Sequence, residues 1–184
     1  RLTMCSLALV ALLVLLCLLP CVKAEVCYEA ESCGTEDMYV DNNGYAVFTD
    51  PTMTNIPTGA FSKCSTLKHL IVPDGVTTVG TNAFACCTAL KSIMLPDSVT
   101  DWGNLAFVKC TALESIVLPN NLTFLGYDTF EGCTALESVV LPNSLTSLGD
   151  QVFSGCTALK SIVLPTGLTS LGDSAFQGCT ALES

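Results

Sequence analysis

The chain has 184 residues, enough for one domain of ordinary size; half of its residues are hydrophobic and only 13% are charged. This composition excludes an intrinsically disordered tail. The formal net charge of −10, from 17 acidic against 7 basic residues, excludes nucleic acid as a partner, because an acidic surface without a basic cluster repels phosphate backbones.

Residues 1–24 predict a secretory signal peptide. An apolar run from Cys5 to Leu19 is followed by the helix-breaking Pro20 and by the short side chains of Val22 and Ala24, so we expect cleavage before residue 25. The run is shorter than the ~20 residues that span a bilayer. An uncleaved signal anchor is the alternative. Either way, the cysteines of the mature chain meet an oxidising environment.

Residues 25–52 do not share the pattern that follows them and predict an N-terminal cap. Asn42, Asn43 and Gly44 lie between two β-prone runs, which is typical of a β-hairpin. Cys27 and Cys33 are close in sequence within this segment. We therefore expect a local disulfide between them.

A strict 23-residue period begins at Met53 and continues to the end of the sequence. A phenylalanine, a cysteine, a leucine and a proline recur together with this step. The phenylalanines are Phe61, Phe84, Phe107, Phe130, Phe153 and Phe176, and the cysteines are Cys64, Cys87, Cys110, Cys133, Cys156 and Cys179. A fixed period between 20 and 50 residues indicates a solenoid, in which each unit buries its apolar face against its neighbours.

One unit divides into three segments. Residues 113–119 form a short β-branched strand that Pro119 ends, and residues 122–126 form a second extended piece closed by Gly126. Residues 127–133 lack strand alternation and predict one or two helical turns. Stacked coils of this kind place equivalent residues about 4.8 Å apart in parallel sheets. The sequence thus predicts an α/β solenoid: a right-handed leucine-rich-repeat coil with a parallel sheet and short helical turns over residues 53–184, truncated at its C-terminal end.

The repeated phrase resembles a known family. Its consensus, L-x-S-[IV]-x-L-P-x-x-[LV]-T-x-[LV]-G-x-x-A-F-x-x-C-T-x-L, is similar to the BspA-like leucine-rich repeat, and the resemblance covers about residues 53–184. It implies a secreted or surface protein and a role in adhesion or ligand binding. Three residues depart from the pattern: Pro57 replaces the repeat glycine, Trp102 replaces the repeat leucine, and Cys86 adds a cysteine.

The column of repeat cysteines is interpreted as a row of buried free thiols that fill a gap in each coil. Inter-coil disulfides and a metal site are the alternatives, but parallel side chains one coil apart neither face each other nor converge on an ion. Removing the three signal-peptide cysteines from 12 leaves 12 − 3 = 9. This odd number requires a free thiol, for which Cys86 is the candidate, unless sequence beyond the given ends or a partner supplies another cysteine.

No enzyme is predicted, and neither is a cofactor or a metal. The only histidine, His69, occupies the column that serines fill in later coils, and no nucleophile with an orienting acid accompanies it. Phosphate-binding glycine loops and paired-carboxylate motifs do not stand out either.

The outward positions of the repeat strand supply the candidate binding residues. An apolar row, here called the apolar strip, lies beside a row of hydroxyls, here called the serine column. The apolar strip consists of Ile71, Met94, Val117, Val140 and Val163, and the serine column of Ser92, Ser115, Ser138 and Ser161. Exposed apolar rows of this length mark contact sites. The alternative is plain β-propensity, with one good strand copied by duplication.

Together these features predict a secreted or cell-surface leucine-rich repeat protein that binds an extracellular protein or glycan through its sheet. The alternative is a structural component of an extracellular or cell-wall matrix without a specific ligand. Membrane attachment is expected only if an anchor follows the given C-terminus. Asn121, in the only Asn-x-Ser/Thr sequon of the repeats, is the glycosylation candidate.

Overall fold

The structure is a computed structural model that describes residues 33–183, so the predicted signal peptide lies outside the described residues. The described chain begins with three short antiparallel strands: β1 (Gly34–Thr35), β2 (Met38–Val40) and β3 (Ala46–Phe48). The Asn-Asn-Gly segment forms the turn between β2 and β3. The Asp41 carboxylate accepts the backbone N–H groups of Asn43 at 2.9 Å and Tyr45 at 2.8 Å. Gly44 supplies the left-handed φ of 88° that closes this turn.

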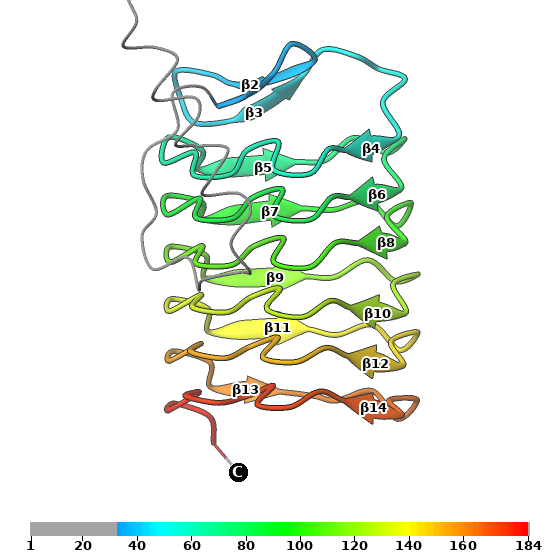
Figure 1. Ribbon diagram of the computed structural model, residues 1–184, viewed down its shortest axis with the longest axis vertical. Helices are drawn as coiled ribbons and strands as arrows, with labels where there is room; N and C mark the ends of the chain where they lie inside the picture. Colours follow the sequence, from blue (N-terminus) through cyan, green and yellow to red (C-terminus); the bar gives the residue numbers. More distant parts are fainter. Residues whose placement is uncertain (1–32, 184) are drawn as a thin grey trace, which may run out of the picture.

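Beyond these strands the chain winds into a β-solenoid (Figure 1). Each coil gives one strand to each of two parallel sheets. The first sheet contains β5 (His69–Ile71), β7 (Ser92–Met94), β9 (Ser115–Val117), β11 (Ser138–Val140) and β13 (Ser161–Ile162). The second contains β4 (Asn55–Ile56), β6 (Thr78–Val79), β8 (Asp101–Trp102), β10 (Phe124–Leu125), β12 (Ser147–Leu148) and β14 (Ser170–Leu171). Paired residues are one period apart, as in Ser115 with Ser138, which confirms the predicted parallel, in-register stacking.

Strand pairing is interrupted at one level of the stack in both sheets. Hydrogen-bonded pairing joins β5 to β7 and runs from β9 to β13 in the first sheet, and it joins β4 through β8 and β10 through β14 in the second. The strands on either side of the break still lie side by side (Figure 1). The turn segments that follow β8 and β10 still connect the two coils at this level, because the Phe107 N–H donates to the Thr129 carbonyl at 3.0 Å.

The helical turns expected at 127–133 and in the equivalent segments are absent, and no helix occurs within residues 33–183. Each coil instead places two residues four positions apart in the left-handed region, such as Leu105 and Lys109, both at φ 57°. A right-handed helix cannot pass through such residues. The segment therefore forms consecutive turns whose N–H groups alternate between their own coil and the next one: Cys110 donates to Phe107 at 3.2 Å, whereas Lys109 donates to Glu131 at 2.7 Å.

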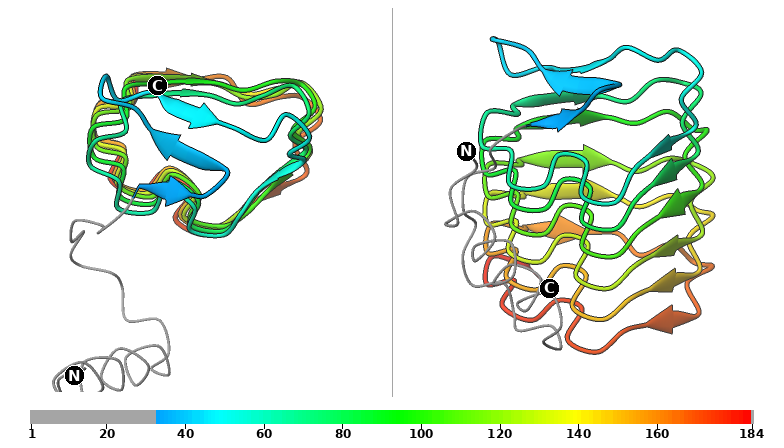
Figure 2. Two further views of the ribbon diagram at one scale, coloured as in Figure 1. Left: turned by 90° about the horizontal axis from the view of Figure 1, so that it is seen from above. Right: turned by 45° about the horizontal axis from the view of Figure 1, so that its top comes forward.

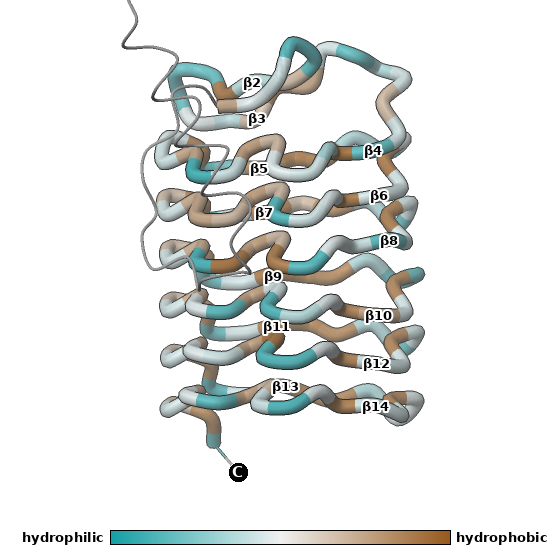
Figure 3. The backbone as a smooth tube through the Cα atoms, viewed as in Figure 1, coloured by the Kyte–Doolittle hydropathy of each residue, from teal (hydrophilic) through white to brown (hydrophobic). Residues whose placement is uncertain are grey.

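The core is a set of columns that run along the solenoid. The six repeat phenylalanines stack nearly parallel, with ring centroids 5.0–5.7 Å apart. Phe48 of the cap adds its ring edge-on to Phe61 at 6.3 Å. Trp102, which replaces a leucine, is buried against Phe107 at 5.3 Å. Figure 3 shows hydrophobic and hydrophilic segments recurring at the same places from coil to coil.

The repeat glycine that follows each strand of the second sheet is required by the close approach of neighbouring coils. A Cβ added at Gly149 would lie 2.6 Å from the Tyr127 backbone nitrogen, and one added at Gly103 would lie 2.3 Å from that of Thr81. The first member of this column, Pro57, has the cap before it rather than another coil. This difference explains why a residue with a side chain replaces glycine only there.

Candidate functional site

The apolar strip lies on the outer face of the first sheet. Its five side chains are 52–82% exposed, whereas the alternate residues of the same strands turn inward. The pairing of Ile71 with Met94 and of Val117 with Val140 sets the members side by side on neighbouring strands, about 4.8 Å apart. The result is a continuous aliphatic row on a regular surface.

The serine column runs parallel to the strip on the same face, and its four members are exposed. Sequence reasoning missed one residue of this column. Tyr45 of the cap forms a parallel bridge with His69, and their rings stack with centroids 4.6 Å apart. The His69 ring nitrogen Nδ1 in turn lies 2.9 Å from the Ser92 hydroxyl. The signal for Tyr45 was weak, because it lies one residue beyond the hairpin turn and outside the exact period.

Charged side chains form the third outward column of the first sheet. Lys160 and Glu137, on neighbouring coils, form an ion pair with 2.7 Å between Nζ and Oε2, and both side chains are largely exposed. An exposed pair of this kind contributes little to stability. This column lies beside the serine column, just before the strands begin, so the apolar strip has polar groups of mixed sign on that side.

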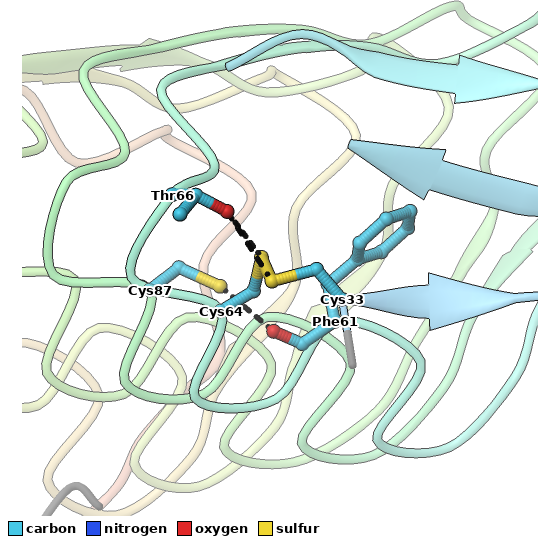
Figure 4. Close-up of a disulfide and its surroundings, with 5 residues drawn as sticks. All are labelled: Cys33, Phe61, Cys64, Thr66 and Cys87. Atoms are coloured by element: carbon cyan, nitrogen blue, oxygen red, sulfur yellow. Dashed lines mark hydrogen bonds between the residues drawn. A yellow bond between two sulfur atoms is a disulfide. The ribbon is translucent and has the colours of Figure 1, made fainter. Parts of the chain in front are cut away.

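The cysteines of the N-terminal end differ from the sequence-based expectation. Cys33 is bonded to Cys64, with the Cα atoms 5.2 Å apart, so the predicted Cys27–Cys33 disulfide is wrong; Cys27 lies outside the described residues. Figure 4 shows this disulfide with the Thr66 hydroxyl 3.3 Å from the Cys33 sulfur. Cys64 is the first member of the repeat column and lies next to the cap. It is therefore close to Cys33 in the fold although the two cysteines are distant in sequence. Cys86 is also disulfide-bonded, so it is not the free thiol that we expected.

Among residues 33–183 the free cysteines are the remaining members of the repeat column, namely Cys87, Cys110, Cys133, Cys156 and Cys179. Each donates its S–H to the carbonyl of a phenylalanine 26 residues earlier, at 3.0–3.2 Å, as Cys87 does to Phe61 (Figure 4). Burial raises the pKa of Cys87 and of Cys156 to about 12. These protonated thiols are poor nucleophiles and poor metal ligands.

Residues 33–183 contain neither a metal-binding cluster nor a membrane-spanning helix. No cluster of three or more His, Cys, Asp or Glu side chains is arranged to hold a metal ion in this part of the chain. Within the same residues, no helix has the length and apolar character needed to cross a membrane.

Asn121, the glycosylation candidate, lies on the surface in the turn between β9 and β10. Its side-chain amide donates a hydrogen bond to the Asp97 carbonyl at 2.8 Å. The neighbouring Asn120 binds the Asp97 carboxylate through its backbone N–H at 2.9 Å, and this bond holds the pKa of Asp97 below its usual value. The sequon is therefore exposed on an ordered turn, and its modification stays a prediction.

The repeat also matches a known family model. The model of the BspA type leucine-rich repeat region matches residues 44–156 in six copies, more than half of the chain. The chain belongs to the BspA-type leucine-rich repeat family. Proteins with this repeat and fold are typically binding scaffolds and not enzymes. Among curated proteins, none matches the sequence.

Three bacterial leucine-rich repeat proteins of known structure are similar to this chain. The leucine-rich repeat protein TpLRR of T. pallidum is 27% identical with a TM-score of 0.61, over 85% of this chain and 92% of that chain. A leucine-rich cell surface protein from Faecalibacterium prausnitzii is 25% identical with a TM-score of 0.57, over 85% of this chain and 47% of that one. A leucine-rich repeat protein from Eubacterium ventriosum is 25% identical with a TM-score of 0.51, over 78% and 50%. The present chain thus spans about half the length of the last two.

Proposed function

We propose that this chain is a secreted or cell-surface binding module whose apolar strip contacts an extracellular protein. The observation that carries the proposal is the exposure of five aliphatic side chains, 52–82% each, in one row on a sheet whose other residues follow the expected burial. A soluble surface rarely leaves such a row in water without a partner. The similarity to a protein described as a bacterial cell surface protein supports the location.

The chemistry of the first sheet favours a protein partner over a glycan. The strip is aliphatic, and a border of serine hydroxyls and mixed charges runs beside it. An apolar centre with a polar rim is the usual arrangement of a protein–protein contact. Within the strip itself no aromatic ring is present on which a sugar could stack. The acidic chain as a whole also disfavours polyanionic partners.

A second candidate function is a structural component of a wall or matrix. The observation in its favour is the uniformity of the coils: the same thiol and phenylalanine contacts recur from level to level. A rod of this kind needs no specific partner.

The two candidates are separated by a double substitution in the middle of the strip. Val117→Asp with Val140→Asp places two like charges one strand apart on the outer face, where the side chains are exposed and folding is retained. Binding of the secreted protein to cells and to immobilised extracellular matrix proteins is then measured, with circular dichroism on each variant. We expect at least about a tenfold loss of binding, since the centre of a contact excludes water.

The matched control is Ser147→Asp with Ser170→Asp, which introduces the same two charges on paired strands of the second sheet. It should bind as the unmodified protein does. Equal binding by the strip variant and the control, with both folded, contradicts the proposal and leaves the structural rod as the better explanation.

A further inference from the structure

A groove of about 380 Å³ lies on the second sheet, away from the apolar strip. It is lined by residues of β6, β8 and β10 and of turns next to these strands, among them Thr78, Asp101, Trp102, Thr123 and Phe124. Its size falls within the range of small-molecule sites, roughly 300–1,000 Å³. Neither the family match nor the strip assigns any role to this groove.

The groove extends over the level at which strand pairing is interrupted between β8 and β10. Repeat glycines elsewhere bind the preceding coil: Gly103 donates its N–H to the Val79 carbonyl at 2.7 Å, and Gly149 donates to Leu125 at 2.8 Å. Gly126, at the break, has no such bond among the described residues. The indole N–H of Trp102 is buried and also has no partner in this part of the chain. The backbone N–H of Gly126 thus lacks the bond that its equivalents make, and the indole N–H of Trp102 is a buried side-chain donor without a partner.

The lining combines one flat apolar ring with many hydroxyls and one carboxylate. The ring of Phe124 is 45% exposed. The hydroxyls of Thr78 and Thr123 make no hydrogen bond within residues 33–183, while the Thr100 hydroxyl donates to the Asp101 carboxylate at 3.2 Å. A sugar ring is complementary to this set, because its C–H face stacks on an aromatic ring and its hydroxyls bond with carboxylate and hydroxyl groups.

Charge narrows the class of sugar. The lining contains no lysine or arginine, and Asp101 adds a negative charge to a chain of net charge −10. Sialic acids, uronic acids and sulfated sugars would therefore be repelled. A neutral saccharide would not be.

The groove also lies where the repeats differ most on this face. By strand register, Thr78, Asp101 and Phe124 occupy one outward column, and the next two members of that column are Ser147 and Ser170. The later coils thus carry the same small residue twice, while the coils of the groove carry three unlike residues. A single unlike set of side chains is what one specific site requires.

We propose that this groove binds a neutral saccharide, with Phe124 stacking on the sugar ring and Asp101 accepting hydrogen bonds from its hydroxyls. The proposal does not depend on the protein-binding role of the apolar strip, which lies on the other sheet.

The only tryptophan of the chain, Trp102, lies at the groove with its ring buried in the core beneath, so intrinsic fluorescence is one readout of occupancy. The full secreted chain is titrated with glucose, mannose, galactose, N-acetylglucosamine and their disaccharides cellobiose, lactose and chitobiose. N-acetylneuraminic acid is the anionic contrast. Isothermal titration calorimetry runs in parallel and registers any binding that leaves the indole unchanged. We expect saturable binding of at least one neutral sugar, and weaker binding of the acid.

Phe124→Ser replaces the ring by the residue that the later coils carry at the same position, so the fold should be kept. We expect it to weaken sugar binding by at least about tenfold. Tyr39→Ser, in strand β2 of the cap, is the matched control: it removes a ring of similar exposure, 47%, outside the groove, and should leave the affinity unchanged. The proposal is overturned if no neutral sugar binds up to roughly 10 mM, tenfold above a millimolar dissociation constant. It is equally overturned if the acid binds best, or if folded Phe124→Ser binds as tightly as the unmodified chain.

Discussion

At the scale of single residues, each buried cysteine thiol donates a hydrogen bond to a backbone carbonyl of the preceding coil. The S–H of Cys110 is directed to the Phe84 carbonyl at 3.2 Å, and the same bond recurs along the column. Deprotonation would set a buried anion against a carbonyl oxygen with no cation nearby. Burial accordingly raises the pKa of Cys110 and of Cys133 well above the ordinary range. The folded state therefore stabilises the protonated form of these thiols.

This arrangement predicts a loss of stability at alkaline pH. Between pH 9 and pH 12 the folded chain keeps the protons of Cys87 and Cys156, whereas the unfolded chain releases them. The folded state then binds more protons, so the free energy of unfolding falls as the pH rises, by about 1.4 kcal/mol per pH unit for each thiol. Urea denaturation at a series of pH values measures this slope.

The control for the pH series is Cys133→Ala, which lowers stability at neutral pH but removes one titrating group. Its slope between pH 9 and pH 12 should be smaller than that of the unmodified chain, which separates the thiols from lysine and tyrosine titration. An identical slope would show that the column thiols are not responsible.

At the scale of the repeated element, the glycine after each second-sheet strand sets how closely two coils approach. Gly149→Ala would bring a Cβ to 2.6 Å from the Tyr127 backbone nitrogen, an atom that cannot move without shifting its coil. We expect a loss of about 1–3 kcal/mol in the free energy of unfolding, the usual cost of overpacking. Thermal and urea denaturation measure it.

Gly167→Ala is the matched substitution for this test. Its Cβ would meet only the Asn143 carbonyl at 3.7 Å, and no left-handed φ is recorded for Gly167. It should be neutral, or stabilising by roughly 0.4–1 kcal/mol through the unfolded state. Equal losses of stability for both variants would mean that the backbone freedom of glycine, and not the close approach of two coils, determines its role.

The same element shows what the sequence could and could not predict. The strands follow from the 23-residue repeat, and their inward and outward residues follow from the two-residue alternation of a strand. The residues of the apolar strip could therefore be predicted from the sequence. The helical turns were predicted wrongly because left-handed positions are recognisable only when glycine fills them, as at Gly132, whereas Leu105 and Asp128 adopt the same conformation without that signal. Spacing along the chain also misled the disulfide prediction, since Cys64 reaches Cys33 across space.

At the scale of the whole molecule, the cap closes one end of the stack. Seen along the solenoid axis, its strands lie across the opening of the first coil (Figure 2). The Gly44 carbonyl accepts the N–H groups of Lys68 at 2.7 Å and His69 at 3.0 Å, and Met38 is buried beneath the hairpin. The Cys33–Cys64 disulfide, whose cysteines have a sequence separation of 31, joins the cap to the coil covalently.

Cys33→Ala should therefore destabilise the N-terminal end of the solenoid. The expected loss is about 2–4 kcal/mol in the free energy of unfolding, the usual contribution of a disulfide that closes a loop of this length. Hydrogen exchange should show faster exchange first in β2 and β3, while β11 to β14 keep their protection. An unchanged denaturation midpoint, or a uniform loss of protection, would contradict the role of this bond.

The phenylalanine stack has a consequence for inheritance. Because successive rings are 5.0–5.7 Å apart with nearly parallel planes, each inner ring of the stack lies between two other phenylalanine rings. Unequal recombination that adds or removes one 23-residue segment between Phe130 and Phe176 would leave every remaining contact with an equivalent neighbour. The length of the solenoid can thus change between generations in whole coils without any compensating substitution. The groove over β6, β8 and β10 is different, because its coils carry unlike residues and the loss of one of them would change its lining.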